Sequence, residues 1–329
     1  MTETPADRTT ALADQSVDQP AQQSARQSES YSAGLPTSST AVAEVDLAPR
    51  RTAREKSRVA PDYARAWLLL SAMRTELFDK AQLSRADQVI LDCEDAIDDS
   101  LKDEARENVI RWIKNGGSAW VRINDRQASS WADDVAQLRG LEGLNGVMLA
   151  KTESADDVID TAQRLGGDVP VIPLVESALG IEEAVNIARA RGAFRLAFGS
   201  GDYRRDTGTA NEPMAMAYPR TRLVVASRIG GLPGPVDGPT VGSSHALLRE
   251  QSADAVILGM TGKLCLDFEQ PAVINESFAP TSSDVAWAVD FFAEFEAAGS
   301  VIRDGSDKPR LARAQVIRSR AELFGINPA

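Results

Sequence analysis

From residue 66 onward, the chain alternates short apolar runs with amphipathic stretches. The runs are AWLLL (66–70), DQVILDC (87–93), SAWVRI (118–123), NGVMLA (145–150), VPVIPLV (169–175), FRLAFG (194–199), PGPVDG (233–238) and DAVILG (254–259). A continuous apolar run of this length is typical of a strand buried on both faces, as in a parallel sheet covered by helices. The stretches between the runs have helical spacing, and we expect helices at 100–114, 154–165, 180–190 and 219–229.

Eight strands alternating with helices imply parallel βαβ units, and eight is the number that closes a (β/α)8 TIM-type barrel. The predicted fold class is therefore α/β. An open doubly wound sheet is the alternative, which is less favoured because no GxGxxG fingerprint follows the first run. The run at 233–238 is the weakest of the eight, since it is short and rich in proline and glycine, and without it the barrel count fails.

The two ends of the chain depart from this pattern. Residues 1–58 are rich in Ser, Thr, Gln, Ala and Asp and hold almost no large apolar side chains, so we predict a disordered N-terminal segment. We interpret its basic stretch, Arg50–Arg58, as a solvated linker. Residues 59–282 would form the barrel. A C-terminal helical extension, which could cap the barrel or pack on a neighbouring subunit, would follow at 283–329, with helices at 283–298 and 309–324.

The composition narrows the class of protein. The net charge of −12 argues against nucleic-acid or anionic-membrane partners. No apolar run approaches the length of a membrane span and no targeting pattern is present, so we expect a cytoplasmic protein. Cys93 and Cys265 lack metal-ligand spacing, which disfavours a disulfide framework or structural zinc. Because His245 is the only histidine, every histidine-based mechanism would have to depend on that residue.

Two of the apolar runs end in a lone carboxylate. Glu176 follows the run at 169–175, and Asp202 follows the run at 194–199. The ends of parallel strands form the rim where α/β folds build their sites. Two hard oxygen ligands facing each other there would suit Mg²⁺, which takes one or two carboxylates plus water and substrate oxygens. The alternative for each residue is an ordinary loop acid or a helix N-cap.

Further polar residues stand at the ends of the other predicted strands, and in a barrel they would converge on the same face. They are Arg74, Glu94, Asp95, Arg122, Asn124, Lys151, Asp237 and Lys263. Several acids and cations in one cleft suggest a metal together with an anionic substrate. We expect Arg74 and Lys151 to contribute to substrate binding. Loops are polar in any case, so only part of this set need be functional.

Several motifs occur in order at these strand ends: ILDCEDAI, WVRIN, GVMLAKTES, PLVES, LAFGSGDY and GMTGKLC. Together, over about residues 66–324, they resemble the citrate lyase β-subunit-like, or HpcH/HpaI aldolase, family of CoA-ester lyases. The resemblance implies a modified TIM barrel that is usually a homo-oligomer. It also implies that Glu176 and Asp202 bind Mg²⁺. Arg122 would bind substrate carboxylate or carbonyl oxygens, and Glu94 and Asp95 would organise the metal's waters.

The resemblance further implies the reaction. Family enzymes make or break a carbon–carbon bond between a 2-oxo acid and an acyl-CoA enolate, with Mg²⁺ polarising the carbonyl. Arg122 would add a fixed cation at the same oxygen. In longer members an aspartate in an xDxP segment reaches the site from an adjacent subunit; Asp307 in SDKP matches it and would move the proton at the thioester α-carbon. We therefore expect a Mg²⁺-dependent lyase acting on a β-hydroxyacyl-CoA such as malyl-CoA, citramalyl-CoA or citryl-CoA.

Two departures from the family pattern lie near where the acyl-CoA would enter. LSAMRTEL keeps Arg74 but lacks the usual Pro-Gly and has Leu77 where a second arginine is common. Residues 266–270 stand in place of the usual Ile-His-Pro-x-Gln. Three alternatives therefore remain: a CoA-independent 2-oxo acid aldolase, a malyl-CoA thioesterase and, less favoured, a non-catalytic binding subunit.

Overall fold

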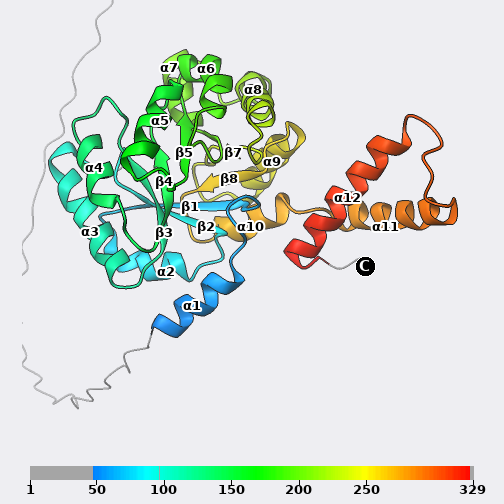
Figure 1. Ribbon diagram of the computed structural model, residues 1–329, viewed down its shortest axis with the longest axis horizontal. Coiled ribbons are helices and arrows are strands. Elements are labelled where there is room, and N and C mark those ends of the chain that lie inside the picture. Colours follow the sequence, from blue (N-terminus) through cyan, green and yellow to red (C-terminus); the bar gives the residue numbers. More distant parts are fainter. Residues whose placement is uncertain (1–46, 96, 327–329) are drawn as a thin grey trace, which may run out of the picture. The chain divides into compact units, whose positions relative to one another are not determined.

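The computed structural model describes residues 47–95 and 97–326, and its centre is a closed barrel of eight parallel strands in which β1 pairs with β8 (Figure 1). The strands are β1 Ala66–Ser71, β2 Gln88–Asp92, β3 Ala119–Ile123, β4 Leu144–Leu149, β5 Val171–Val175, β6 Ala197–Phe198, β7 Val236–Asp237 and β8 Gly262–Cys265. The predicted (β/α)8 TIM-type barrel is confirmed, and the open sheet is excluded. The weakly predicted seventh strand exists, although β7 is only two residues long.

Helices follow the strands and surround the barrel (Figure 1). They are α2 Phe78–Gln82, α3 Lys102–Lys114, α4 Trp131–Leu138, α5 Ala155–Arg164, α6 Ala178–Ala188, α7 Ser200–Thr207, α8 Pro213–Gly230, α9 His245–Ile257 and α10 Gln270–Ser277. All four helices expected from the spacing are confirmed. The last of them, α8, begins six residues before the predicted start at 219, because Pro213 is tolerated in the first turn and Pro219 lies inside the helix.

The eighth strand lies at Gly262–Cys265, so the prediction of a strand at 254–259 is wrong. The DAVILG run forms the end of α9, and Gly259 follows with a left-handed φ of +95°. A short apolar run bounded by turn residues cannot be distinguished from a buried helical segment by periodicity alone. As a result Lys263, which was expected to follow the strand, lies within it and is 1% exposed.

The strand residues are buried on both faces, as their apolar runs predicted. In β2, Ile90 points into the barrel and belongs to the same hydrophobic cluster as Trp67 and Trp120. The rings of these two tryptophans pack edge to face, with their centres 5.4 Å apart. The neighbouring residues Val89 and Leu91 belong instead to the larger core between the strands and the surrounding helices. Because successive strand side chains point to opposite faces, one apolar run supplies both cores.

Part of the segment predicted to be disordered is folded. Residues 1–46 lie outside the described residues, but Leu47–Ser57 forms helix α1. The basic stretch is not a solvated linker, because Arg51, Arg54 and Arg58 bind the barrel. Arg54, for example, donates hydrogen bonds of 3.1 and 2.7 Å to the carbonyls of Ser84 and Ala86. These carbonyls lie in the connection before β2, where no helix or strand satisfies them, and a guanidinium group can supply the missing donors.

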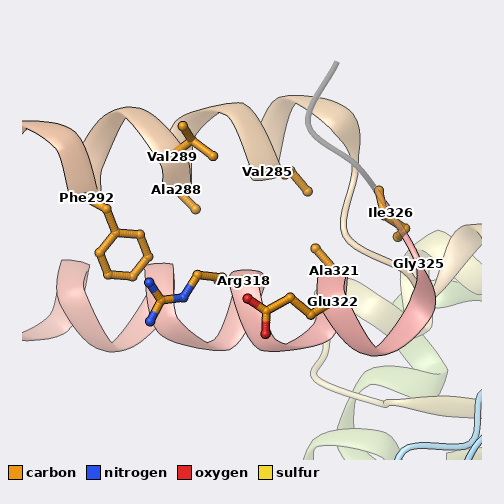
Figure 2. Close-up of a pocket in the computed structure, with 9 residues that line it drawn as sticks. All are labelled: Val285, Ala288, Val289, Phe292, Arg318, Ala321, Glu322, Gly325 and Ile326. Atoms are coloured by element: carbon orange, nitrogen blue, oxygen red, sulfur yellow. The ribbon is translucent and has the colours of Figure 1, made fainter.

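Helices α11 Ser282–Ala297 and α12 Asp307–Phe324 pack against each other. Both predicted C-terminal helices are confirmed, and α12 begins two residues earlier than expected. Thr281 starts α11 through a capping box with Asp284. A groove of about 290 Å³ between the two helices is lined by Val285, Ala288, Val289, Phe292, Arg318, Ala321, Glu322, Gly325 and Ile326 (Figure 2).

Neither cysteine of the described chain forms a disulfide, and both are buried. Among the described residues, no helix combines the length and apolar character that a membrane crossing requires. The division of the chain at residues 58 and 282 stays a prediction.

Candidate active site

The candidate site lies at the carboxyl ends of β2 to β6 and is organised around Arg122. Arg122 stands in β3 directly opposite Asp92 of β2. Its Nε and Nη2 donate to the two carboxylate oxygens of Asp92, each at 2.7 Å, and its Nη1 lies 3.1 Å from Oε2 of Glu94. Both residues of the Arg122–Asp92 pair are buried. The paired geometry therefore fixes the plane of the guanidinium group.

The electrostatics keep Arg122 charged. Burial alone would lower the pKa of its guanidinium group, but the charge of Asp92 and the hydrogen bonds to it, followed by the charge of Glu94, more than compensate. Its pKa consequently lies above the ordinary value. Arg122 is thus a permanent cation held at the rim of the barrel.

Lys151 links the acids that follow β2 to the acid that follows β5. Its Nζ contacts Glu94 and lies 3.1 Å from Oδ1 of Asp95, while its backbone N–H donates to Oε1 of Glu176 at 2.8 Å. Lys151 has a φ of +46°, a backbone conformation that is uncommon for a residue with a side chain and is found disproportionately at functional sites. Lys151 lies in the turn after β4 and brings the two groups of acids to one place.

The pKa values of two neighbouring acids, Glu94 and Asp95, are shifted in opposite directions. Burial raises the pKa of Glu94, although Arg122 and Lys151 counteract it. For Asp95 burial also opposes ionisation, but hydrogen bonds from Glu94 and Lys151 and the charge of Arg122 prevail and lower its pKa to about 2. Asp95 is 41% exposed at its side chain and reaches toward solvent, whereas Glu94 is buried. The pair therefore offers one ionised and one less acidic carboxyl group beside the same cation.

Glu176 is a buried acid whose pKa is raised chiefly by its burial. Its pKa is about 8: burial and the charges of Asp202 and Glu94 raise it, while the hydrogen bond from the Lys151 backbone and the charge of Arg122 partly counteract them. Gly199 makes room for this side chain, since a Cβ at position 199 would overlap the carboxyl group of Glu176. Only glycine fits at this position of the β6–α7 connection.

Asp202 lies in the first turn of α7, directly after β6, and β6 is the neighbour of β5 in the barrel. Its carboxylate is partly exposed and pairs with Arg205 at 2.9 Å, within its own helix. The structure thus brings Asp202 and Glu176 to the same end of two adjacent strands, close enough for the charge of one to shift the pKa of the other.

This acid pair fits Mg²⁺. In residues 47–95 and 97–326 there is no group of three or more His, Cys, Asp or Glu side chains arranged to hold a metal. Mg²⁺ needs no such cage, because it retains waters and commonly takes one or two carboxylates plus substrate oxygens. A divalent cation would also compensate the negative charge that raises the pKa of Glu176.

Other residues from the predicted set do not join this group. Arg74 is exposed and its Nε lies 3.4 Å from Glu76. Asp307 is at the start of α12, where it accepts hydrogen bonds from the backbone and guanidinium group of Arg303 at 2.9–3.3 Å. In the described part of one chain, Asp307 has no hydrogen bond or ion pair with Arg122, Glu176 or Asp202.

Three strand-end residues are structural rather than part of the cleft. Asn124 is buried and binds Asp134 at 2.7 Å. Asp237 is fully buried and accepts hydrogen bonds from Arg220 and from Lys263. Each of these side chains binds a partner inside the fold, which favours a structural role over one in lining the site.

Two residues of the site were missed from the sequence. Asp92 was hidden at the end of an apolar run, although the two-residue period that points Ile90 inward also points Asp92 inward. Gly199 gave no signal, since its role depends on the position of Glu176 in the neighbouring strand.

Comparisons with known proteins show the family to which the chain belongs. The family model described as HpcH/HpaI aldolase/citrate lyase matches residues 65–267, and the HpcH/HpaI aldolase C-terminal domain matches residues 283–325. The L-malyl-CoA/beta-methylmalyl-CoA lyase of Rhodobacter capsulatus is 29% identical over 293 residues, which are 76% of this chain and 92% of that protein.

A second relative is the citrate lyase subunit beta-like protein of Mycobacterium tuberculosis, which is 32% identical over 269 residues, or 78% of this chain and 94% of that protein. Among solved structures, CitE from Mycobacterium tuberculosis in complex with magnesium, acetoacetate and coenzyme A has a TM-score of 0.68 and 27% identity. The matched region is 79% of this chain and 99% of the CitE chain. Since the first family model spans more than half of the sequence, the chain belongs to the HpcH/HpaI aldolase/citrate lyase family.

Proposed function

We propose that this protein is a Mg²⁺-dependent carbon–carbon lyase that cleaves, or in reverse forms, a β-hydroxyacyl-CoA ester. The products of cleavage are a 2-oxo acid and an acyl-CoA. The observation that carries the proposal is the grouping of Arg122, Glu176 and Asp202 at one end of the barrel. The family supports the reaction class, and the relatives include a malyl-CoA lyase and a solved structure with magnesium and coenzyme A.

Glu176 and Asp202 would hold the metal. Bound Mg²⁺ supplies a Lewis acid that polarises the oxygen on the carbon where the bond is made or broken. The backbone N–H of Lys151 holds Oε1 of Glu176 at 2.8 Å, so the carboxylate is oriented before any ligand arrives. This preorganisation reduces the cost of positioning the groups when the substrate binds.

Arg122 would bind the carboxylate or carbonyl oxygen of the 2-oxo acid. In the cleavage direction, the hydroxyl of the substrate gives its proton to the ionised carboxylate of Asp307, whose role is described below, and becomes the carbonyl of the oxo acid while the bond to the thioester α-carbon breaks. A fixed cation beside that oxygen stabilises the charge that develops on it. The pairing with Asp92 keeps Arg122 in place, and Lys151 adds a second cation on the same side.

The electron pair of the broken bond passes to the thioester α-carbon, which then takes up a proton. We assign this proton transfer to Asp307 of a neighbouring subunit in a homo-oligomer, because Asp307 lies in the segment matched by the family's C-terminal domain. Hydrogen bonds from Arg303 lower the pKa of Asp307, so it is ionised at neutral pH and able to accept a proton in the synthetic direction.

Mixing two inactive variants tests the assignment of Asp307. Arg122→Gln lacks the substrate-binding cation and Asp307→Asn lacks the proton carrier. Co-expressed in one cell, they should form mixed oligomers in which one site has both residues, and activity should return. Activity that stays absent in the mixed oligomers, with both variants folded, would reject transfer between subunits.

The principal test is a substrate panel with and without Mg²⁺. Purified protein is given malyl-CoA, citramalyl-CoA and citryl-CoA, and separately free 4-hydroxy-2-oxo acids; the oxo acid formed from each substrate is measured. We expect oxo acid and acyl-CoA from at least one CoA ester, and only with Mg²⁺. Release of free CoA thiol without oxo acid would identify a thioesterase, and turnover of free hydroxy-oxo acids alone would identify a CoA-independent aldolase.

A matched pair of variants tests the metal site. Glu176→Gln keeps the size of the side chain but removes the charge, and it should abolish both Mg²⁺ binding and turnover. Glu183→Gln is the control, since Glu183 lies on α6 and its carboxylate accepts a hydrogen bond from Asn186 of the same helix. Full activity in Glu176→Gln would refute the metal assignment. If the wild-type protein binds a CoA ester or an oxo acid but turns over none of the substrates in the panel, a non-catalytic binding subunit is favoured instead.

A further inference from the structure

A second cavity, of about 380 Å³, lies at the opposite end of the barrel from the candidate active site. Among its lining residues, Asp62 precedes β1, Gly234 precedes β7 and Thr261 precedes β8. In a parallel barrel, the segments that precede the strands all lie at the amino ends, whereas Glu176 and Asp202 follow their strands. The cavity is therefore separate from the site described above.

Arginines dominate the polar lining of this cavity. Arg65 is neutralised by Asp87 at 2.9 Å, and its guanidinium group stacks 3.8 Å from the ring centre of Phe324. Arg228 of α8 and Arg320 of α12 also line the cavity. Throughout the described residues, neither of their guanidinium groups has a hydrogen-bond or ion-pair partner. Two unpaired cations thus face a common space.

A further cation, Arg195, adjoins the cavity and binds its lining residues Gly234 and Thr261. Arg195 is fully buried and donates hydrogen bonds of 2.7–2.9 Å to the carbonyls of Pro61, Ala64 and Gly234 and to the hydroxyl of Thr261. All of these acceptors are neutral. Burial lowers the pKa of Arg195; the charges of Asp62 and Asp87 counteract this effect, and the charge of Arg320 adds to it. The positive charge at this end of the barrel is consequently in excess of its carboxylates.

We propose that this cavity binds a small dianion, a phosphate group or a dicarboxylate, through Arg228 and Arg320. Guanidinium groups match the oxygens of both kinds of anion and form two parallel hydrogen bonds to them. The excess of cations is local, because the chain as a whole has a net charge of −12. The volume lies within the range of about 300–1,000 Å³ that small-molecule sites occupy.

Binding would also connect parts of the fold. Arg228 belongs to a helix of the barrel and Arg320 to the last helix of the chain, so an anion held by both would tie α12 to the barrel. A ligand that binds the folded state raises its stability in proportion to the logarithm of the ligand concentration. The midpoint of thermal unfolding should therefore rise as the anion is added.

Calorimetric titration of the full chain with inorganic phosphate, and separately with malonate, tests the proposal at constant ionic strength. We expect at least one of the two to bind, and Arg320→Gln and Arg228→Gln each to weaken that binding by about ten-fold or more. Asp62→Asn should tighten it, because Asp62 is a competing negative charge in the lining.

Arg318→Gln is the matched control. It lies two residues from Arg320 on the same helix, but its guanidinium group stacks over Phe292, 4.2 Å from the ring centre, and lines the other groove (Figure 2). Binding should be unchanged in this variant. The proposal is overturned if neither anion binds. It is also overturned if the anion binds Arg320→Gln with the same affinity as the wild type, since the site would then lie elsewhere. The thermal midpoint of each variant without ligand shows that it is folded.

Discussion

Replacing Asp92 by asparagine tests whether a buried ion pair holds Arg122 in its working orientation. Asp92 is 2% exposed and receives two hydrogen bonds of 2.7 Å from Arg122. Asparagine has nearly the same shape, but it has no charge and presents an N–H₂ donor where the guanidinium group needs an acceptor. The change therefore removes the charge of one partner and leaves the other buried.

The structure indicates the size of the effect. Removing one partner of a buried ion pair typically costs about 3–5 kcal/mol. Here the Nη1 atom of Arg122 keeps two other carboxylates, Glu94 at 3.1 Å and Asp95 at 3.6 Å. They offset part of the loss, so we expect the free energy of unfolding to fall by about 2–4 kcal/mol. Turning toward them would also displace Arg122 from the substrate, and kcat/KM should fall on the order of 100-fold.

Urea unfolding at pH 7 and steady-state kinetics measure the two effects. The control is Asp103→Asn, because the side chain of Asp103 is 83% exposed although it also pairs with an arginine, Arg106. An exposed partner contributes little, and the control should lose less than about 1 kcal/mol. The positioning role of Asp92 is refuted if the free energy of unfolding of Asp92→Asn lies within about 0.5 kcal/mol of the wild-type value, the ordinary range for surface substitutions, and its kcat/KM is unchanged. The pair would then not position Arg122.

Three further predictions concern other parts of the fold. Gly199→Ala should push Glu176 aside and weaken Mg²⁺ binding by about 10–100-fold, measured by calorimetry; unchanged affinity would contradict the close packing. Burial raises the pKa of the Cys93 and Cys265 thiols, so a thiol reagent at pH 8 should modify neither until the protein is unfolded, and rapid labelling of the native protein would be the opposite result. Burial opposes ionisation of Asp237, but its buried cationic partners keep its pKa below the ordinary value of 3.8. Its stabilising effect is therefore present above about pH 4 and lost as the pH falls further, so Asp237→Asn should show a shallower loss of unfolding free energy between pH 5 and 3 than the wild type.

The arrangement of the barrel could be predicted from the sequence because its strands are buried on both faces. Such strands appear as continuous apolar runs, and the acids that end them stand out, as Glu176 does. The eighth run was misplaced for the same reason. At 254–259 the chain is also apolar, but the run belongs to the end of a helix, and apolar character alone does not separate the two.

The predicted disorder extended too far along the chain, because Leu47–Ser57 is a helix. Residues 47–57 contain too few large apolar side chains to predict a packed element, and the helix they form has no buried residues. It is attached instead by arginines such as Arg54, which bind carbonyls of the barrel. Attachment through hydrogen bonds leaves no hydrophobic pattern, so composition indicated disorder where a helix is present.

By itself, the sequence determined seven of the eight strands, most of the helices and the strand-end acids, because burial and side-chain period act on neighbouring residues along the chain. Which of these residues meet was decided only by closure of the barrel. Asp92 faces Arg122 through the register of β2 against β3, and Arg195 collects carbonyls from segments up to 134 residues away. Contacts of this kind depend on the pairing of distant strands, and no local pattern records them.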